Sequence, residues 1–212
     1  CFGGKHVNTP RIDQMAAEGS RLTSFYVAAP VCTPSRAALM TGSYPKRVNM
    51  ATGSNFGVLL AGDKKGLNPD EITIAEVLKG AGYKTGMFGK WHLGEPGESG
   101  PEEHGFDVNV GGYEAGSPRS YFSPYRNPHL PDGPVGEYLT DRLTDEVVDF
   151  LHQHTSKDAV QPFYVQLCHY AVHTPIQAKH EDEAAFADRE PDGGQGNAAY
   201  AGMVLSLDRS VG

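Results

Sequence analysis

Apolar residues recur at helical spacing in several parts of the chain, often after a capping residue or before a glycine. The clearest amphipathic pattern runs from 137 to 154, where Leu139 and Leu143 share one side. Thr73 and Glu76 have the spacing of a capping box, in which each side chain accepts a hydrogen bond from the other residue's backbone. The patterns predict helices over these segments: 11–18, 34–41, 73–80, 137–154 and the residues from 197 onward.

Runs of β-branched, aromatic and other apolar residues alternate with these helices. Residues 21–28 and 83–88 are rich in strand-forming side chains, and residues 162–168 form a continuous apolar run. Strands that alternate with helices are typical of an α/β domain. We therefore expect a largely parallel central sheet flanked by helices, with residues 1–212 forming part of a single domain.

Between about residue 94 and residue 136, glycine, proline, asparagine and serine interrupt every regular pattern. A long irregular stretch inside a domain is usually a functional loop. The part from 111 to 134 brings aromatic rings close to two arginines, so it is either a platform for an anionic sugar or a loop packed onto the domain. These residues are Tyr113, Arg119, Tyr121, Phe122, Tyr125 and Arg126. A further loop is expected at 176–196.

Composition excludes some partners. The net charge of −8 argues against a broad basic face for nucleic acid, although a few local cations suffice for a small anion. No apolar run approaches the ~18 residues of a transmembrane helix, so we expect no membrane partner. The three cysteines are Cys1, Cys32 and Cys168, a sparse and odd set that makes a poor disulfide framework. Either all three are inert, or one of them is reactive.

Cys32 lies where a reactive side chain would meet an anion. Thr33 and Pro34 are typical of a helix start, where unpaired backbone N–H groups favour negative charge. Arg36, about one turn further along, offers a forked donor to an oxyanion. The alternative is an inert buried cysteine beside an arginine in a surface ion pair. The Cys-x5-Arg loop of tyrosine phosphatases does not fit, because here the arginine comes too early.

Two further segments carry candidate chemistry. Lys90 and His92 follow the strand predicted at 83–88, and in an extended backbone they would face the same way while Trp91 faces the core. A fixed cation beside a titratable donor suits a sulfate or phosphate oxygen and a leaving group. His173 follows the last predicted strand, at the end where α/β sheets build their sites. Each histidine, taken singly, has a plain structural interpretation as the alternative.

Together these segments resemble a known family. C-T-P-S-R-A-A-L-M-T-G, starting at Cys32, resembles the sulfatase signature C-x-P-S-R with its helix of small residues and T-G. G-Y-K-T-G-M-F-G-K-W-H-L-G, at 82–94, resembles the second sulfatase signature, and H-Y-A-V-H-T-P, at 169–175, resembles the family's H-x-P segment. The chain thus resembles, over essentially its whole length, the type I, formylglycine-dependent, arylsulfatase-like sulfatases of the alkaline-phosphatase superfamily.

The resemblance implies hydrolysis of sulfate esters, either aryl sulfates or sulfated carbohydrates such as a sulfated glycan. Cys32 would become the nucleophile after oxidation to formylglycine by a formylglycine-generating or anaerobic maturation enzyme, and Ca²⁺ would assist. Lys90 and His173 would bind the sulfate and help to protonate the leaving oxygen. His92 would assist the formylglycine hydrate, and Arg36 would hold it in position.

The resemblance also implies that the domain is incomplete at both ends. The opening, C-F-G-G-K-H-V-N-T-P-R-I-D, resembles sequence just after the family's first metal-binding aspartate pair, and the chain stops before a later Asp-Asn pair. Of the calcium ligands, only Cys32 as formylglycine would then lie in this chain. We expect the fragment itself to be inactive, His169 to be structural, and the protein to be periplasmic, secreted or lysosomal.

Two other functions remain open at this point. A member of the same superfamily that cleaves phosphate or phosphonate esters would carry much of the same chemistry. A non-catalytic relative that binds anions or glycans would bind sulfated sugar without any dependence on Cys32.

Overall fold

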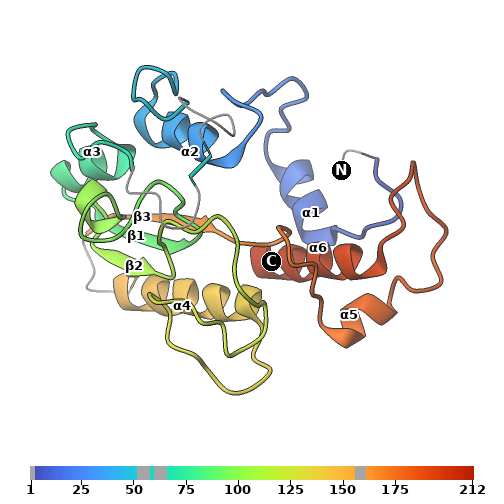
Figure 1. The fold of residues 1–212 in the computed structure, drawn as a ribbon. Helices are drawn as coiled ribbons and strands as arrows, with labels where there is room; N and C mark the ends of the chain where they lie inside the picture. Colours follow the sequence, from blue (N-terminus) through green and yellow to red (C-terminus); the bar gives the residue numbers. More distant parts are fainter. Residues whose placement is uncertain (1–2, 52–57, 60–65, 156–160) are drawn as a thin grey trace.

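A computed structural model describes residues 3–51, 58–59, 66–155 and 161–212 of the chain (Figure 1). Helices and strands alternate along much of it. The elements, in order, are α1 (Pro10–Glu18), α2 (Cys32–Thr41), α3 (Ile74–Gly80), β1 (Lys84–Gly89), the 3-10 turn η2 (Glu102–His104), β2 (Val108–Val110), α4 (Leu139–His154), β3 (Phe163–Cys168), α5 (His180–Ala184) and α6 (Ala198–Val211).

The strands form a parallel sheet with the order β2-β1-β3. Gly86 of β1 aligns with Val108 on one side and with Val165 on the other, so all three carboxyl ends point to the same edge. The structure confirms the α/β class and the strands predicted at 83–88 and 162–168. The prediction of an irregular region at about 94–136 is wrong in one respect, because the region contains β2. This strand of three residues is too short to show a periodic pattern.

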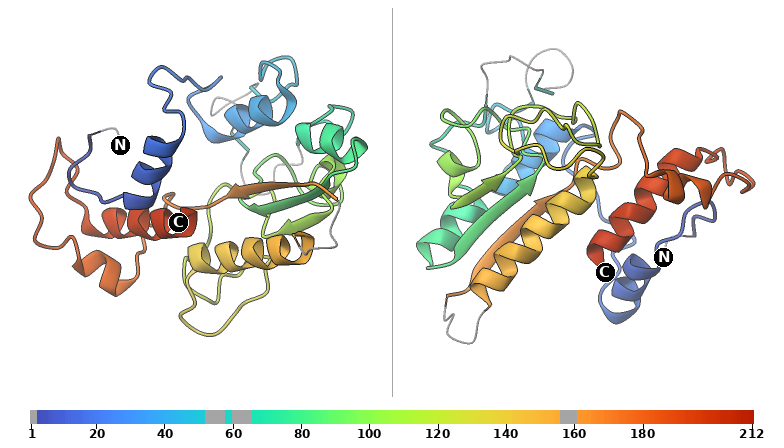
Figure 2. Two further views of the ribbon diagram at one scale, coloured as in Figure 1. Left: turned by 180° about the vertical axis from the view of Figure 1, so that it is seen from behind. Right: turned by 90° about the horizontal axis from the view of Figure 1, so that it is seen from below.

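Helices cover both faces of the sheet (Figure 2). On one face, Phe88 of β1 meets Phe150 of α4 edge-on, with ring centroids 5.6 Å apart. On the other face, Met87 packs in a cluster with Ala37 of α2 and Ala75 of α3. Neighbouring residues of a strand point to opposite faces, so β1 joins the two cores.

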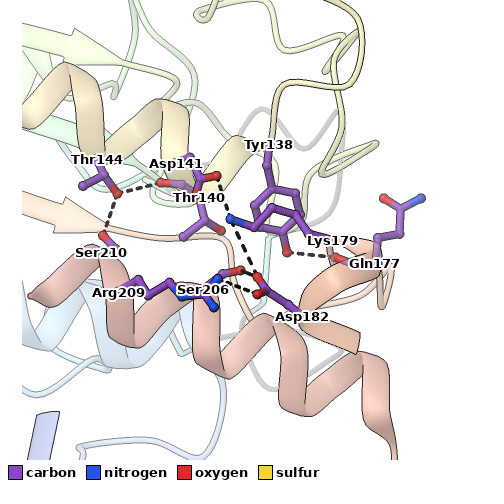
Figure 3. Close-up of polar contacts among 10 residues, drawn as sticks. All are labelled: Tyr138, Thr140, Asp141, Thr144, Gln177, Lys179, Asp182, Ser206, Arg209 and Ser210. Atoms are coloured by element: carbon purple, nitrogen blue, oxygen red, sulfur yellow. Dashed lines mark hydrogen bonds and ion pairs between the residues drawn. The ribbon is translucent and has the colours of Figure 1, made fainter. Parts of the chain in front are cut away.

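Helices α1, α5 and α6 form a second group beyond the end of the sheet (Figure 2). The buried Asp182 of α5 accepts a hydrogen bond from Ser206 of α6 at 2.7 Å and pairs with Arg209 (Figure 3). Ser210 of α6 in turn meets Thr144 of α4 at 2.6 Å. Polar contacts therefore fasten this group to the helix that covers the sheet.

Three predicted features are wrong in detail. Residues 21–28 form no strand: Tyr26 is 86% exposed, and none of the strands in the described part of the chain lies beside them to pair their backbone groups. Helix α2 begins at Cys32 rather than at Pro34, and Thr33 does not cap it. The loop predicted at 176–196 contains the short helix α5. The other predicted helices are confirmed, and no helix in the described residues is long and apolar enough to cross a membrane.

Candidate active site

Cys32 is the first residue of α2 and is half-buried; it interacts with Lys90, which follows β1 at the carboxyl edge of the sheet. The backbone N–H groups of a first helical turn have no partner within the helix and attract negative charge. Parallel α/β sheets build ligand sites at this edge. The local fold therefore places the cysteine where an anion would be held.

Lys90 directly follows β1, is buried, and shares a hydrogen bond with this cysteine. Gly89 precedes it with φ +89°, and a Cβ there would lie 2.2 Å from the carbonyl oxygen of Cys168, so only glycine permits this close passage. The backbone N–H of Lys90 donates to the same carbonyl at 2.7 Å. The main chain thus fixes the start of the lysine side chain.

The charge of Lys90 is controlled by its surroundings. Burial lowers the pKa of Lys90, whereas the neighbouring Cys32, which also shares a hydrogen bond with it, opposes this shift. Arg36 lowers the pKa further because it brings a second positive charge. A bound anion would remove this conflict between two adjacent cations, so the pair is suited to a sulfate-like group.

Arg36 does more for the lysine than its sequence position suggested. Its Nη1 donates to the carbonyl oxygen of Lys90 at 2.7 Å. One arm of the guanidinium therefore holds the backbone of the segment that follows β1. The other N–H groups of the guanidinium are the ones that would serve the anion-binding role predicted for Arg36.

His92 is almost fully buried, and its Nε2 lies 2.9 Å from the carbonyl oxygen of Leu59. Burial lowers the pKa of His92 to about 4, and the charges of Lys90, Arg36 and His173 act in the same direction. The imidazole is therefore neutral at ordinary pH. A neutral ring that donates from Nε2 has its lone pair on Nδ1, which is buried without a protein partner.

The extended backbone expected from Lys90 to His92 is wrong, because His92 has φ 59°. The left-handed turn is held by a hydrogen bond from the His92 N–H to the carbonyl of Tyr113 at 2.9 Å. Both side chains still reach one site, since the positive charge of Lys90 affects the pKa of His92. Trp91 faces the core as predicted, and its Nε1 donates to the carbonyl of Ser99.

His173 lies in the segment after β3 and is exposed. It is near enough to His92 to lower that residue's pKa, so the structure brings both histidines to the same edge as Cys32. The hydroxyl of Tyr121 donates to the His173 carbonyl at 2.9 Å and anchors the segment. His169 differs: it is turned to α6, where its Nε2 lies 2.7 Å from the Ser210 hydroxyl.

The aromatic loop packs rather than forming a platform. Tyr121 and Tyr125 are fully buried, and the Tyr125 hydroxyl donates to Glu137 at 2.8 Å. These rings belong to a core cluster with residues of α4. Of the two interpretations of this loop, the structure supports packing.

One contributor to the site gave no sequence signal. The N–H of Leu59 donates to the hydroxyl of Thr33 at 3.1 Å, and its carbonyl faces His92. The Leu59 backbone thus connects the start of α2 to the histidine. A backbone contact of this kind carries no side-chain pattern, so a motif search cannot find it.

The fold and the site define a class of protein: an α/β domain with cations, histidines and a cysteine at the carboxyl edge of a parallel sheet. The Sulfatase family model matches residues 1–212, and the chain belongs to the sulfatase family. Its sulfatase neighbours among solved structures share the alkaline-phosphatase-like fold.

Particular relatives agree with this assignment. N-acetylgalactosamine-6-sulfatase of Sus scrofa is 35% identical over 235 residues, which cover 100% of this chain and 42% of that protein. Steryl-sulfatase of Rattus norvegicus is 48% identical over 118 residues, covering 52% of this chain and 20% of that protein. The crystal structure of Ps i-CgsB matches with a TM-score of 0.81 at 33% identity, covering 99% of this chain and 49% of that one. The chain therefore spans less than half the length of these relatives.

Proposed function

We propose that the protein hydrolyses sulfate esters at the site around Cys32. The observation that carries the proposal is the buried Lys90 beside Cys32 at the start of α2, in a chain of the sulfatase family. A buried ammonium with a second cation next to it, from Arg36, is costly unless an anion joins them. A sulfate group supplies that anion.

Cys32 fits the proposed conversion to formylglycine, which a maturation enzyme would carry out. The residue is half-buried at a helix start and has a lysine within hydrogen-bonding reach. As a hydrate, formylglycine would supply one hydroxyl that attacks sulfur while the ester S–O bond breaks and the alcohol leaves with a proton. Deprotonation of the second hydroxyl would then re-form the aldehyde and release sulfate as the C–O bond to it breaks, and water would restore the hydrate. An unmodified thiol has no equivalent second group.

The surrounding side chains divide the remaining work. Lys90 binds a sulfate oxygen, with its backbone held by Arg36. His92 is neutral, so its free Nδ1 can accept a proton from a hydroxyl at position 32. His173 is exposed at the same edge and can donate a hydrogen bond to the sulfate or to the leaving oxygen.

Calcium remains a separate expectation. No group of three or more histidine, cysteine, aspartate or glutamate side chains within the described residues could hold a metal ion. In this chain formylglycine at position 32 is the calcium ligand that the family resemblance implies. The roles assigned above to the lysine, the arginine and the histidines do not depend on a bound calcium ion.

A sulfated glycan is the substrate class that the relatives favour. Ps i-CgsB, which is 33% identical to this chain, has been crystallised in complex with k-i-k-neocarrahexaose. A second structure, 27% identical, holds its substrate D-glucosamine-2-N,6-O-disulfate. N-acetylgalactosamine-6-sulfatase also acts, by its name, on a sulfated sugar. The periplasmic, secreted or lysosomal location is proposed on the family resemblance alone.

A kinetic comparison tests the proposal. The complete protein, produced with a maturation enzyme, is assayed with matched aryl sulfate, aryl phosphate and aryl phosphonate esters. We expect the highest kcat/KM for the sulfate and loss of that activity in Cys32→Ala. Preference for a phosphorus ester would instead indicate the hydrolase of phosphate or phosphonate esters. Binding of sulfated sugar without turnover, unchanged in Cys32→Ala, would indicate a non-catalytic relative.

A further inference from the structure

Gly116 lies directly against the imidazole of His92. A Cβ placed on Gly116 would be 2.4 Å from Cε1 of the ring and 2.8 Å from each ring nitrogen, closer than real Cβ contacts allow. The backbone φ of Gly116 is outside the left-handed range, so an alanine is permitted there by the main chain. The close approach to His92, rather than an unusual turn, is what requires glycine.

The histidine cannot move aside without losing another contact. Its Nε2 lies 2.9 Å from the carbonyl oxygen of Leu59, and the side chain is only 2% exposed. Leu59 is itself tied to the Thr33 hydroxyl, next to Cys32. A larger residue at position 116 would push the imidazole of His92 away from the Leu59 carbonyl and would change the position of the imidazole relative to the start of α2.

We propose that Gly116 is a positioning residue for the reaction: with the Leu59 carbonyl it holds the imidazole of His92 in place, so that Nδ1, which has no protein partner, stays available to the attacking group at position 32. The Leu59 contact selects the ring nitrogen that carries the proton, and Gly116 limits the plane of the ring. The inference rests on the proposed function for its catalytic consequence. The clamp itself is a property of the fold and is measured separately.

The test is a double-mutant cycle in the complete, matured protein. Gly116→Ala is expected to lower kcat for an aryl sulfate by about 100-fold, because displacement of a catalytic group by about 1 Å has this order of effect. KM should change much less, since the three heavy atoms nearest to the Gly116 Cβ position all belong to His92 and not to the groups proposed to bind sulfate. Gly80→Ala is the matched control: Gly80 ends α3, has no atom within 4 Å of its Cβ position and has an ordinary φ.

The same cycle includes His92→Ala, which removes the ring that the new methyl group would strike. Gly116→Ala should lower the thermal midpoint in the wild-type background and leave it unchanged in the His92→Ala background. In that background it should also cause no further loss of kcat. Equal losses in both backgrounds, or full activity of Gly116→Ala, would overturn the proposal.

The thermal midpoints separate the two hypotheses. If the wild-type protein turns over no sulfate ester, the proposed function fails. The clamp is still supported if Gly116→Ala destabilises the wild-type protein and not the His92→Ala variant. If the wild-type protein is active and the destabilisation is the same in both backgrounds, the clamp alone is refuted.

Discussion

Replacement of Lys90 by methionine should separate activity from stability. The two backbone contacts of Lys90, with Cys168 and with Arg36, involve only its main chain and survive the substitution. Methionine has a similar length and suits a buried site. The change therefore removes the ammonium and little else.

The two effects have opposite signs. Loss of a charged donor that stabilises the transition state costs about 3 to 4 kcal/mol, so kcat should fall by about 10²–10³-fold. Burial lowers the pKa of Lys90, which means that the folded protein pays to keep this group charged. Without a bound anion, Lys90→Met should therefore leave the thermal midpoint unchanged or raise it.

The assay combines aryl sulfate kinetics with thermal unfolding of the complete protein. Lys84→Met is the control, because Lys84 lies at the other end of β1, where it pairs with Asp107 at 3.6 Å. It should keep its activity. A Lys90→Met protein that is fully active, or one that is inactive only because it unfolds, would refute the assignment of Lys90 to the sulfate.

Three further predictions concern pH and stability. His92, with a pKa of about 4, should contribute no ionisation to kcat/KM between about pH 5 and pH 7, and an ionisation in that range that His92→Gln abolishes would contradict this. Burial raises the pKa of Asp107, but hydrogen bonds from Lys79 and the Thr85 backbone bring it to about 2, so its stabilisation is present above about pH 4 and is lost as the pH falls towards 2. Asp107→Asn should accordingly lower the free energy of unfolding by about 1–2 kcal/mol at pH 7. The thermal midpoints of the wild-type protein and the variant should therefore differ at pH 7 and converge as the pH falls to about 2. Asp182→Ala should leave the buried Ser206 hydroxyl unpaired, so amide hydrogen exchange should become faster in α5 and α6 and stay unchanged in β1. Exchange rates that change equally in all three elements, or in none, would show that the network does not stabilise α5 and α6 locally.

Local sequence signals predicted much of the fold. The capping box at Thr73 and Glu76 is present, with the Thr73 N–H donating to Glu76 at 2.8 Å. The amphipathic pattern of α4 and the strands at the predicted positions are also confirmed. The strand predicted at residues 21–28 is absent, because residues with high strand propensity form a strand only where another strand pairs with their backbone. Helix α2 starts earlier than predicted, and Thr33 bonds to Leu59 instead of capping it.

Sequence patterns predicted which residues form the candidate site better than they predicted how these residues are arranged. Cys32, Lys90, His92 and His173 could be named because their residue types carry the chemistry. The left-handed turn at His92 and the contact of Arg36 with the Lys90 carbonyl depend on where distant segments meet. Gly116 gave no signal, because a missing side chain is informative only once its neighbour is known.

The proposed nucleophile is tested most directly by the mass of the peptide that contains Cys32, isolated from active protein produced with a maturation enzyme. We expect a peptide that has lost one sulfur and two hydrogens and gained one oxygen, which is the change from a thiol side chain to an aldehyde. Its abundance should rise in proportion to aryl sulfatase activity. An active protein whose Cys32 remains entirely an unmodified thiol would contradict the proposed nucleophile.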